Sequence, residues 1–96
     1  MVEKTAVSTA EEAFELLKRE GYGSLYLWED PPGAFYDWHA HPNDEVRLVL
    51  KGEITIGTED GVFTLVPGDK MAVPAGTRHW ARVGKEGVVY VCGTKI

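Results

Sequence analysis

The chain lacks a second cysteine: Cys92 stands alone, so no internal disulfide can form. A lone cysteine is typical of proteins that fold in a reducing compartment, and we expect a cytoplasmic location. The sequence also lacks any apolar run near the ~20 residues that a membrane-spanning helix requires. Its first residues contain no apolar targeting segment. These absences predict a protein with no membrane partner.

Positive charge is also scarce. The chain carries 10 lysines and arginines against 15 acidic residues, which gives a formal net charge of −5. Its only adjacent basic pair, Lys18-Arg19, is followed directly by Glu20. Because an acidic surface repels a phosphate backbone, we expect no nucleic-acid partner.

The length of the chain favours a single domain. A chain of 96 residues, 44% of them hydrophobic, can form one small core, and the sequence contains no repeat or linker. We therefore expect a single domain over residues 1–96, with a helix near 9–20 and a barrel near 22–93.

The N-terminal segment has the pattern of an amphipathic helix. Residues 8–12 offer two overlapping capping boxes, Ser8 with Glu11 and Thr9 with Glu12. Apolar residues then recur at helical spacing, and a glycine at position 21 suits a left-handed C-terminal cap. These signals predict one helix over about residues 9–20.

From residue 21 onward, short extended runs alternate with turn residues. The runs lie near 22–28, 34–41, 45–50, 53–58, 62–66, 70–73, 78–84 and 87–93. Because glycine supplies the positive φ of tight turns, we interpret Lys51-Gly52 and Asp60-Gly61 as two-residue hairpin loops and residues 84–87 as a further corner. About eight short strands in so small a chain predict an all-β fold, an antiparallel sandwich or barrel.

The three histidines of the chain suggest a metal site. His39 and His41 lie two residues apart in one predicted strand, so their side chains leave the same face with Cα atoms roughly 6–7 Å apart. Two imidazoles at that spacing can converge on one ion. The turn at residues 42–44 returns the chain with a glutamate, and the third histidine begins a later strand after a Pro-Ala-Gly turn. We therefore expect one divalent metal, with open positions for water or substrate, bound by four side chains: His39, His41, Glu45 and His79.

Two spaced motifs contain these residues. The first is G-x5-HAH-x3-E-x6-G over residues 33–52, and the second is G-x5-PAG-x2-H over residues 68–79. In residue type and spacing they resemble the two motifs of the cupin superfamily, and the small single-domain members in particular. One position departs from the family pattern, because Val83 stands where the second motif usually ends in asparagine. That asparagine is not a metal ligand in the family, so the departure leaves the predicted metal site unchanged.

The resemblance implies a fold and a type of site. The fold would be a cupin-type antiparallel double-sheet jelly-roll barrel with one short N-terminal α-helix. Three histidines with one glutamate are similar to the ligand set of cupin dioxygenases. Ligand type alone allows Fe, Mn, Ni, Cu or Zn, so the identity of the metal stays open. We expect no catalytic residue beyond the metal site.

Strand alternation extends the site to a possible substrate pocket. If the paired histidines face inward, so do Phe35 and Asp37, and if Glu45 faces inward, so does Arg47. Arg47 is then the only cation placed near the metal by alternation. It either anchors an anionic group of a substrate or is a rim residue that pairs with Asp37 or another acid. We expect other large aromatic residues in the core or in an interface rather than in the pocket, namely Trp28, Trp38, Trp80 and Tyr90.

Fold alone does not settle function, because the cupin barrel hosts many activities. We favour a small metal-dependent enzyme, of the non-haem oxygenase or isomerase/lyase type, that acts on a small organic molecule in the barrel mouth. The alternative is a non-catalytic small-ligand-binding or sensing module that works with a partner protein. We also expect a homodimer, because a domain of this size has short sheet edges and an apolar helix stripe.

Overall fold

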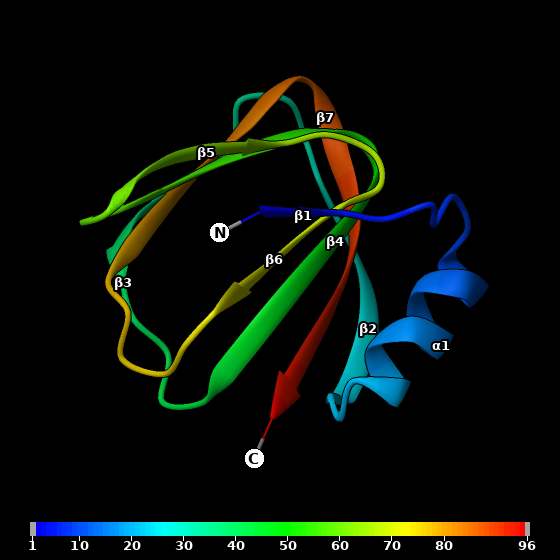
Figure 1. The fold of residues 1–96 in the computed structure, drawn as a ribbon. Coiled ribbons are helices and arrows are strands. Elements are labelled where there is room, and N and C mark those ends of the chain that lie inside the picture. Colours follow the sequence, from blue (N-terminus) through cyan, green and yellow to red (C-terminus); the bar gives the residue numbers. More distant parts are fainter. Residues whose placement is uncertain (1, 96) are drawn as a thin grey trace.

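The computed structural model describes residues 2–95, which form one helix and a seven-stranded sheet (Figure 1). Every strand pair is antiparallel. In chain order the elements are β1 (Val2–Lys4), α1 (Ala10–Arg19), β2 (Gly23–Asp30), β3 (Phe35–His39), β4 (Asp44–Thr58), β5 (Gly61–Leu65), β6 (Asp69–Val73) and β7 (His79–Lys95).

The two long strands, β4 and β7, divide the sheet into two layers. The first half of β4 pairs with β6, whereas its second half pairs with β5. β7 follows β4 along both halves, and it pairs with β3 in its first half and with β2 in its second. The layers β1-β6-β4-β7-β2 and β5-β4-β7-β3 curve around one interior (Figure 1). The predicted all-β, double-sheet jelly roll with one short N-terminal helix is confirmed.

Two of the predicted turns are bends within continuous strands. The segments expected at 45–50 and 53–58 form the single strand β4, and those expected at 78–84 and 87–93 form β7. Gly52 does have positive φ (71°), but it lies at a register shift in the β4–β7 ladder rather than in a hairpin loop. A glycine inside a strand can form a bulge that bends the strand without reversing it. The prediction of a hairpin at Lys51-Gly52 was therefore wrong.

Smaller differences concern the strand ends. The β4–β5 turn consists of residues 59 and 60, because Gly61 already pairs with Thr58, so the predicted loop was displaced by one residue. β1 was not predicted from the sequence. This three-residue strand adds to the edge of β6, and its pattern is too short to be distinguished from a loop.

The helix is close to the predicted one. Thr9 caps it: the Thr9 hydroxyl accepts a hydrogen bond from the Glu12 N–H at 3.2 Å, and the Glu12 carboxylate accepts one from the Thr9 N–H at 3.1 Å. Of the two capping boxes that the sequence allows, the second one forms. Gly21 follows the last turn with a φ of 93°. Within residues 2–95, no helix is long and apolar enough to cross a membrane.

The helix determines which face of β4 points into the barrel. Val46 and Leu48 pack beneath α1 and are fully buried. Because side chains alternate along a strand, Glu45 and Arg47 face the interior. The interior contains an apolar cluster, whose buried members are Val49, Ile54, Ile56, Leu65, Met71, Val73, Ala81, Val83, Val88, Tyr90 and Cys92. The histidines lie beside this cluster, because several of its members line the same cavity.

Candidate metal centre

Three histidines from separate segments meet at one end of the barrel. His39 ends β3, His41 lies in the following loop, and His79 begins β7 directly opposite His39. One ring nitrogen from each lies within 4.8 Å of those of the other two. Their ring centroids are 4.2 to 5.2 Å apart. The part of the chain that the structure describes therefore contains a group of three imidazoles able to hold a metal ion.

Main-chain carbonyls orient two of these rings. His39 Nδ1 lies 2.6 Å from the Asp37 carbonyl oxygen, and His79 Nδ1 lies 2.9 Å from the Thr77 carbonyl oxygen. A carbonyl oxygen can only accept, so each Nδ1 carries the proton and donates it. The Nε2 atom of each ring then keeps its lone pair, as a metal ligand requires.

Two of the Nε2 atoms are buried without a partner. Those of His41 and His79 have no hydrogen bond within residues 2–95. Leaving a buried polar atom unpaired typically costs ~1–3 kcal/mol, so such atoms usually have a function or an external partner. A divalent ion would satisfy both at once. The donor atoms in this part of the barrel therefore fit a metal.

The imidazoles of His41 and His79 both favour the neutral form. Burial lowers the pKa of His41, an effect that the Arg47 charge reinforces and the nearby Glu45 carboxylate opposes. Burial also lowers the pKa of His79, against the hydrogen bond to Thr77. A neutral imidazole has a free lone pair, so both side chains are suited to bind a cation at neutral pH.

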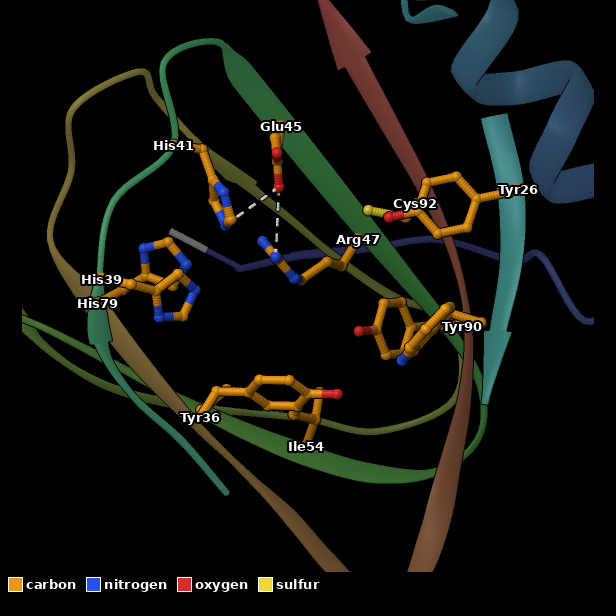
Figure 2. A pocket seen from close by; sticks show the side chains of 12 residues that line it. Tyr26, Tyr36, His39, His41, Glu45, Arg47, Ile54, His79, Tyr90 and Cys92 are labelled. Atoms are coloured by element: carbon orange, nitrogen blue, oxygen red, sulfur yellow. Dashed lines mark hydrogen bonds and ion pairs between the residues drawn. The ribbon is translucent and has the colours of Figure 1, made fainter. Parts of the chain in front are cut away.

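Glu45 lies beside the histidines on β4. Its Oε1 atom is 3.5 Å from His41 Nε2 and 3.4 Å from Arg47 Nη2 (Figure 2). It does not belong to the tight group of three ring nitrogens. The geometry thus brings the predicted glutamate next to the predicted histidines, with its carboxylate shared between an imidazole and a guanidinium.

A cavity of about 210 Å³ opens beside the histidines (Figure 2). The residues that line it include five predicted from the sequence, namely His39, His41, Glu45, Arg47 and His79. The remaining lining residues come mainly from β2 and the second half of β7, and they are Tyr26, Trp28, Tyr36, Ile54, Ala81, Tyr90 and Cys92. Most of these are aromatic, so the histidine group faces an apolar wall with hydroxyl groups.

Phe35 and Asp37 do not line this cavity, so their predicted place in the pocket was wrong. The β3–β7 register shifts between Tyr36 and His39, so strict alternation fails there. Tyr36 therefore faces the cavity in place of its neighbours. Phe35 is 52% exposed, and the carboxylate of Asp37 accepts a hydrogen bond from the next backbone N–H at 2.8 Å. Asp37 contributes to the site through its carbonyl alone.

The expectation that Trp28 and Tyr90 lie outside the pocket was also wrong. The ladder pairs Tyr26 with Cys92 and Trp28 with Tyr90, and Cys92 with Arg47. Alternate residues of β2 and β7 therefore share the inner face with Arg47. Alternation within these two strands was visible in the sequence, but the pairing that brings them to Arg47 was not. The adjacent Cys92 thiol, together with burial, raises the pKa of Tyr26 to about 12, which keeps its hydroxyl protonated.

Comparison with known proteins shows which family the sequence matches. A family model described as a cupin domain matches residues 26–92. Among curated relatives, an acireductone dioxygenase of Stutzerimonas stutzeri is 41% identical over 56 residues, which cover 54% of this chain and 31% of the relative. An acireductone dioxygenase of Pseudomonas fluorescens is 33% identical over 88 residues, which cover 78% of this chain and 49% of the relative. The chain thus spans half or less of the length of these relatives.

Solved structures agree on the architecture. The DMSP lyase DddQ from Ruegeria pomeroyi matches with a TM-score of 0.69 at 27% identity, over 75% of this chain and 37% of that one. A cupin superfamily protein from Desulfitobacterium hafniense matches with a TM-score of 0.69 at 24% identity, over 100% of this chain and 78% of that one. At 24% identity, the second match shows only that the two proteins share a fold.

Proposed function

Because the chain belongs to the cupin family, we propose that it is a small metal-dependent enzyme of the dioxygenase type. It acts on a small organic molecule that enters the cavity beside the histidines. One divalent transition metal is held there by four side chains: His39, His41, Glu45 and His79. The metal is Fe, Mn, Ni, Cu or Zn, because each of these accepts imidazole and carboxylate ligands.

The convergence of three imidazoles on one cavity, two of them oriented by main-chain carbonyls, is the observation that carries this proposal. Two of their Nε2 atoms are buried without a hydrogen bond within the described residues, and the tautomers of His39 and His79 are set by carbonyl groups. A purely structural cluster would leave these lone pairs without a partner. The acireductone dioxygenase relatives support an oxygenase, although the chain covers only 31% to 49% of those two proteins.

The residues of the chain have distinct tasks in this proposal. A bound metal supplies Lewis acidity, and a redox-active one also allows electron transfer between substrate and oxygen. The aromatic side chains of the cavity exclude bulk water and hold the flat part of a small substrate. Tyr26 stays protonated and offers a hydroxyl donor near the metal centre.

Oxygen uptake by protein loaded with iron or manganese tests the proposal. The substrates are an acireductone and a panel of small carbonyl and phenolic compounds, and substrate loss is followed in parallel. We expect uptake with at least one compound, and no uptake by metal-free protein or by a His79→Ala variant that remains folded. Substrate loss without oxygen uptake would indicate an isomerase or lyase. Saturable binding with no turnover under any metal would refute the enzyme and favour the non-catalytic binding module.

A further inference from the structure

Arg47 is a charged residue of the barrel interior that is buried and only partly paired. We infer that the cavity binds a small organic carboxylate and that Arg47 holds the carboxylate group. The inference rests on the proposed function, because it names the class of substrate for the same site. It goes beyond that function, because an oxygenase does not need an anionic substrate.

The burial of Arg47 demands a partner. The residue is 8% exposed, and its Nη1 atom is buried without a hydrogen bond to any group in residues 2–95. A guanidinium keeps its charge in proteins, so it cannot avoid the cost of burial by losing a proton. A buried N–H donor of a charged group that lacks an acceptor destabilises the folded state, even when another atom of the same group is paired. An anion in the cavity removes this penalty.

The acids of the chain do not fill this role. Glu45 Oε1 lies 3.4 Å from Arg47 Nη2, and the same oxygen lies 3.5 Å from His41 Nε2. If Glu45 completes the metal site, its charge is directed toward the ion rather than to Arg47. Asp30 accepts a hydrogen bond from the Tyr36 hydroxyl at 2.7 Å and does not line the cavity. Asp37, the other acid considered for Arg47, is also outside the cavity.

The guanidinium is directed at the space where a ligand would sit. In Figure 2 it extends from β4 into the region between the histidines and the tyrosines. Within the described chain it is the only cationic side chain that lines this cavity. Its planar fork matches the two oxygens of a carboxylate and can donate two parallel hydrogen bonds.

Charge and size define the ligand further. With a divalent ion bound, the ion, Glu45 and Arg47 leave the lining with an excess of positive charge. A monoanion or dianion is therefore favoured over a neutral or cationic molecule. The cavity of about 210 Å³ is smaller than the ~300–1,000 Å³ of pockets that take drug-sized ligands. The ligand is therefore a small carboxylate with a second oxygen that can reach the metal.

Binding of matched acids and amides tests the inference without turnover. Zinc-loaded protein is titrated with oxalate and pyruvate and with their neutral counterparts oxamide and pyruvamide. Binding is followed by calorimetry and by the fluorescence of tryptophan, since Trp28 lines the cavity. We expect each carboxylate to bind at least tenfold more tightly than its amide. Equal affinity of acid and amide for the wild-type protein would overturn the inference.

Variants separate Arg47 from the metal, which also prefers anions. Arg47→Gln should reduce the preference for the acid to threefold or less while zinc content stays unchanged. Arg82→Gln is the matched control, because Arg82 stacks on Phe35 and Trp80 outside the cavity and should leave the preference intact. Arg47→Lys keeps the positive charge but lacks the two parallel N–H donors of the guanidinium. It should retain part of the preference for the acid over the amide. An undiminished preference in folded Arg47→Gln would refute the role of Arg47.

The outcomes distinguish this inference from the proposed function. If the protein binds neither zinc nor iron, manganese, nickel or copper, the proposed metal centre fails, and the same titrations of metal-free wild type and Arg47→Gln still decide whether Arg47 binds carboxylates. If zinc binds and no carboxylate does, the carboxylate inference fails and the metal centre stands. If Arg47→Gln loses both zinc and the acid preference, Arg47 serves to position Glu45, and the inference is refuted.

Discussion

Main-chain carbonyls, rather than acidic side chains, orient two of the three imidazoles of this barrel. His39 and His79 each donate from Nδ1 to the carbonyl two residues earlier. These acceptors belong to the backbone of β3 and of the loop before β7, so side-chain substitutions at Asp37 and Thr77 leave them in place. The tautomers are therefore a property of the backbone conformation, and the ligand set can be altered one side chain at a time.

Glu45→Gln tests whether the carboxylate completes the metal site. The substitution keeps the size of the side chain but removes a charge that lies 3.5 Å from His41 Nε2. We expect the metal affinity to fall by at least tenfold, measured by competition with a chromogenic chelator. Asp37→Asn is the control, because its side chain lies outside the cavity. Equal affinities for Glu45→Gln and wild type would exclude Glu45 as a ligand.

At the residue scale, spacing around one turn predicted His39, His41 and Glu45 as neighbours, whereas the association of His79 with them followed from the resemblance to the cupin motifs. Alternation also placed Arg47 correctly on the inner face of β4. It failed for Phe35 and Asp37, because the register shift in β3 reverses which side chains face inward. A bulge of this kind depends on the partner strand, which a local pattern does not contain.

At the scale of the elements, two glycines make the bend that divides the sheet into layers. Gly52 has a φ of 71°, and a Cβ added to it would collide with the carbonyl oxygen of Gly87 on the neighbouring strand. Gly87 also has positive φ, at 79°. The close approach of β4 and β7 at this point therefore requires glycine at position 52, while the positive φ of Gly87 favours glycine on β7.

Gly52→Ala should destabilise the fold more than a glycine substitution that meets no neighbour. Gly33 is the matched control, because it has a φ of 76° and nothing within 4 Å of an added Cβ. Gly33→Ala introduces only backbone strain, about 1 kcal/mol, whereas Gly52→Ala adds a backbone clash and should cost roughly 3 kcal/mol. Urea unfolding of metal-free protein measures both. If both variants lost the same free energy of unfolding, β4 and β7 would be able to move apart at Gly52 without strain.

Asp69 connects the β1 edge to the barrel. It is 1% exposed, it accepts a hydrogen bond from the Val66 N–H at 3.0 Å, and it pairs with Lys4 Nζ at 2.9 Å. Burial would raise the pKa of Asp69, but the Val66 and Lys4 contacts outweigh it and hold the pKa below its ordinary value of 3.8. Asp69 therefore stabilises the ionised folded state.

This shift predicts the acid dependence of stability. Because the folded-state pKa is depressed, the contribution of Asp69 is fully present above the unfolded-state pKa of 3.8 and is lost as the pH falls through the folded-state pKa. Asp69→Asn should be less stable than wild type at neutral pH and should lose less stability between about pH 4 and pH 2. Urea unfolding across this range measures the effect, with Asp60→Asn in the exposed β4–β5 turn as control. If the free energy of unfolding of Asp69→Asn and of wild type depended on pH in the same way, this prediction would be contradicted.

The elements that the sequence predicted best were those with local signals. The capping box and apolar spacing set α1 to within about a residue at each end. The glycines marked the points where the chain changes direction, but whether a glycine reverses a strand or bends it depends on long-range pairing. That is why four predicted strands became β4 and β7, and why β1, which exists only by pairing with β6, was not predicted.

At the scale of the whole molecule, β2 lies at an open edge of its layer. In the described chain it pairs with β7 alone, and Leu27 on this strand is 52% exposed. An exposed edge with an apolar side chain favours pairing with a second copy. We predict that the protein is a homodimer, as measured by analytical sedimentation. The substitution Leu27→Glu should shift the monomer–dimer equilibrium toward the monomer. Val62→Glu, on β5 and 65% exposed, is the control. A monomer at every concentration would contradict this.

The metal content of protein purified without added metal or chelator tests the central claim most directly. The account predicts about one transition-metal ion per chain in the wild-type protein. It also predicts loss of that ion in His39→Ala and His79→Ala variants whose circular dichroism remains that of the folded barrel. A wild-type protein that contains no metal and takes up none when iron, manganese, nickel, copper or zinc is supplied would contradict the account, as would a His79→Ala variant with unchanged metal content.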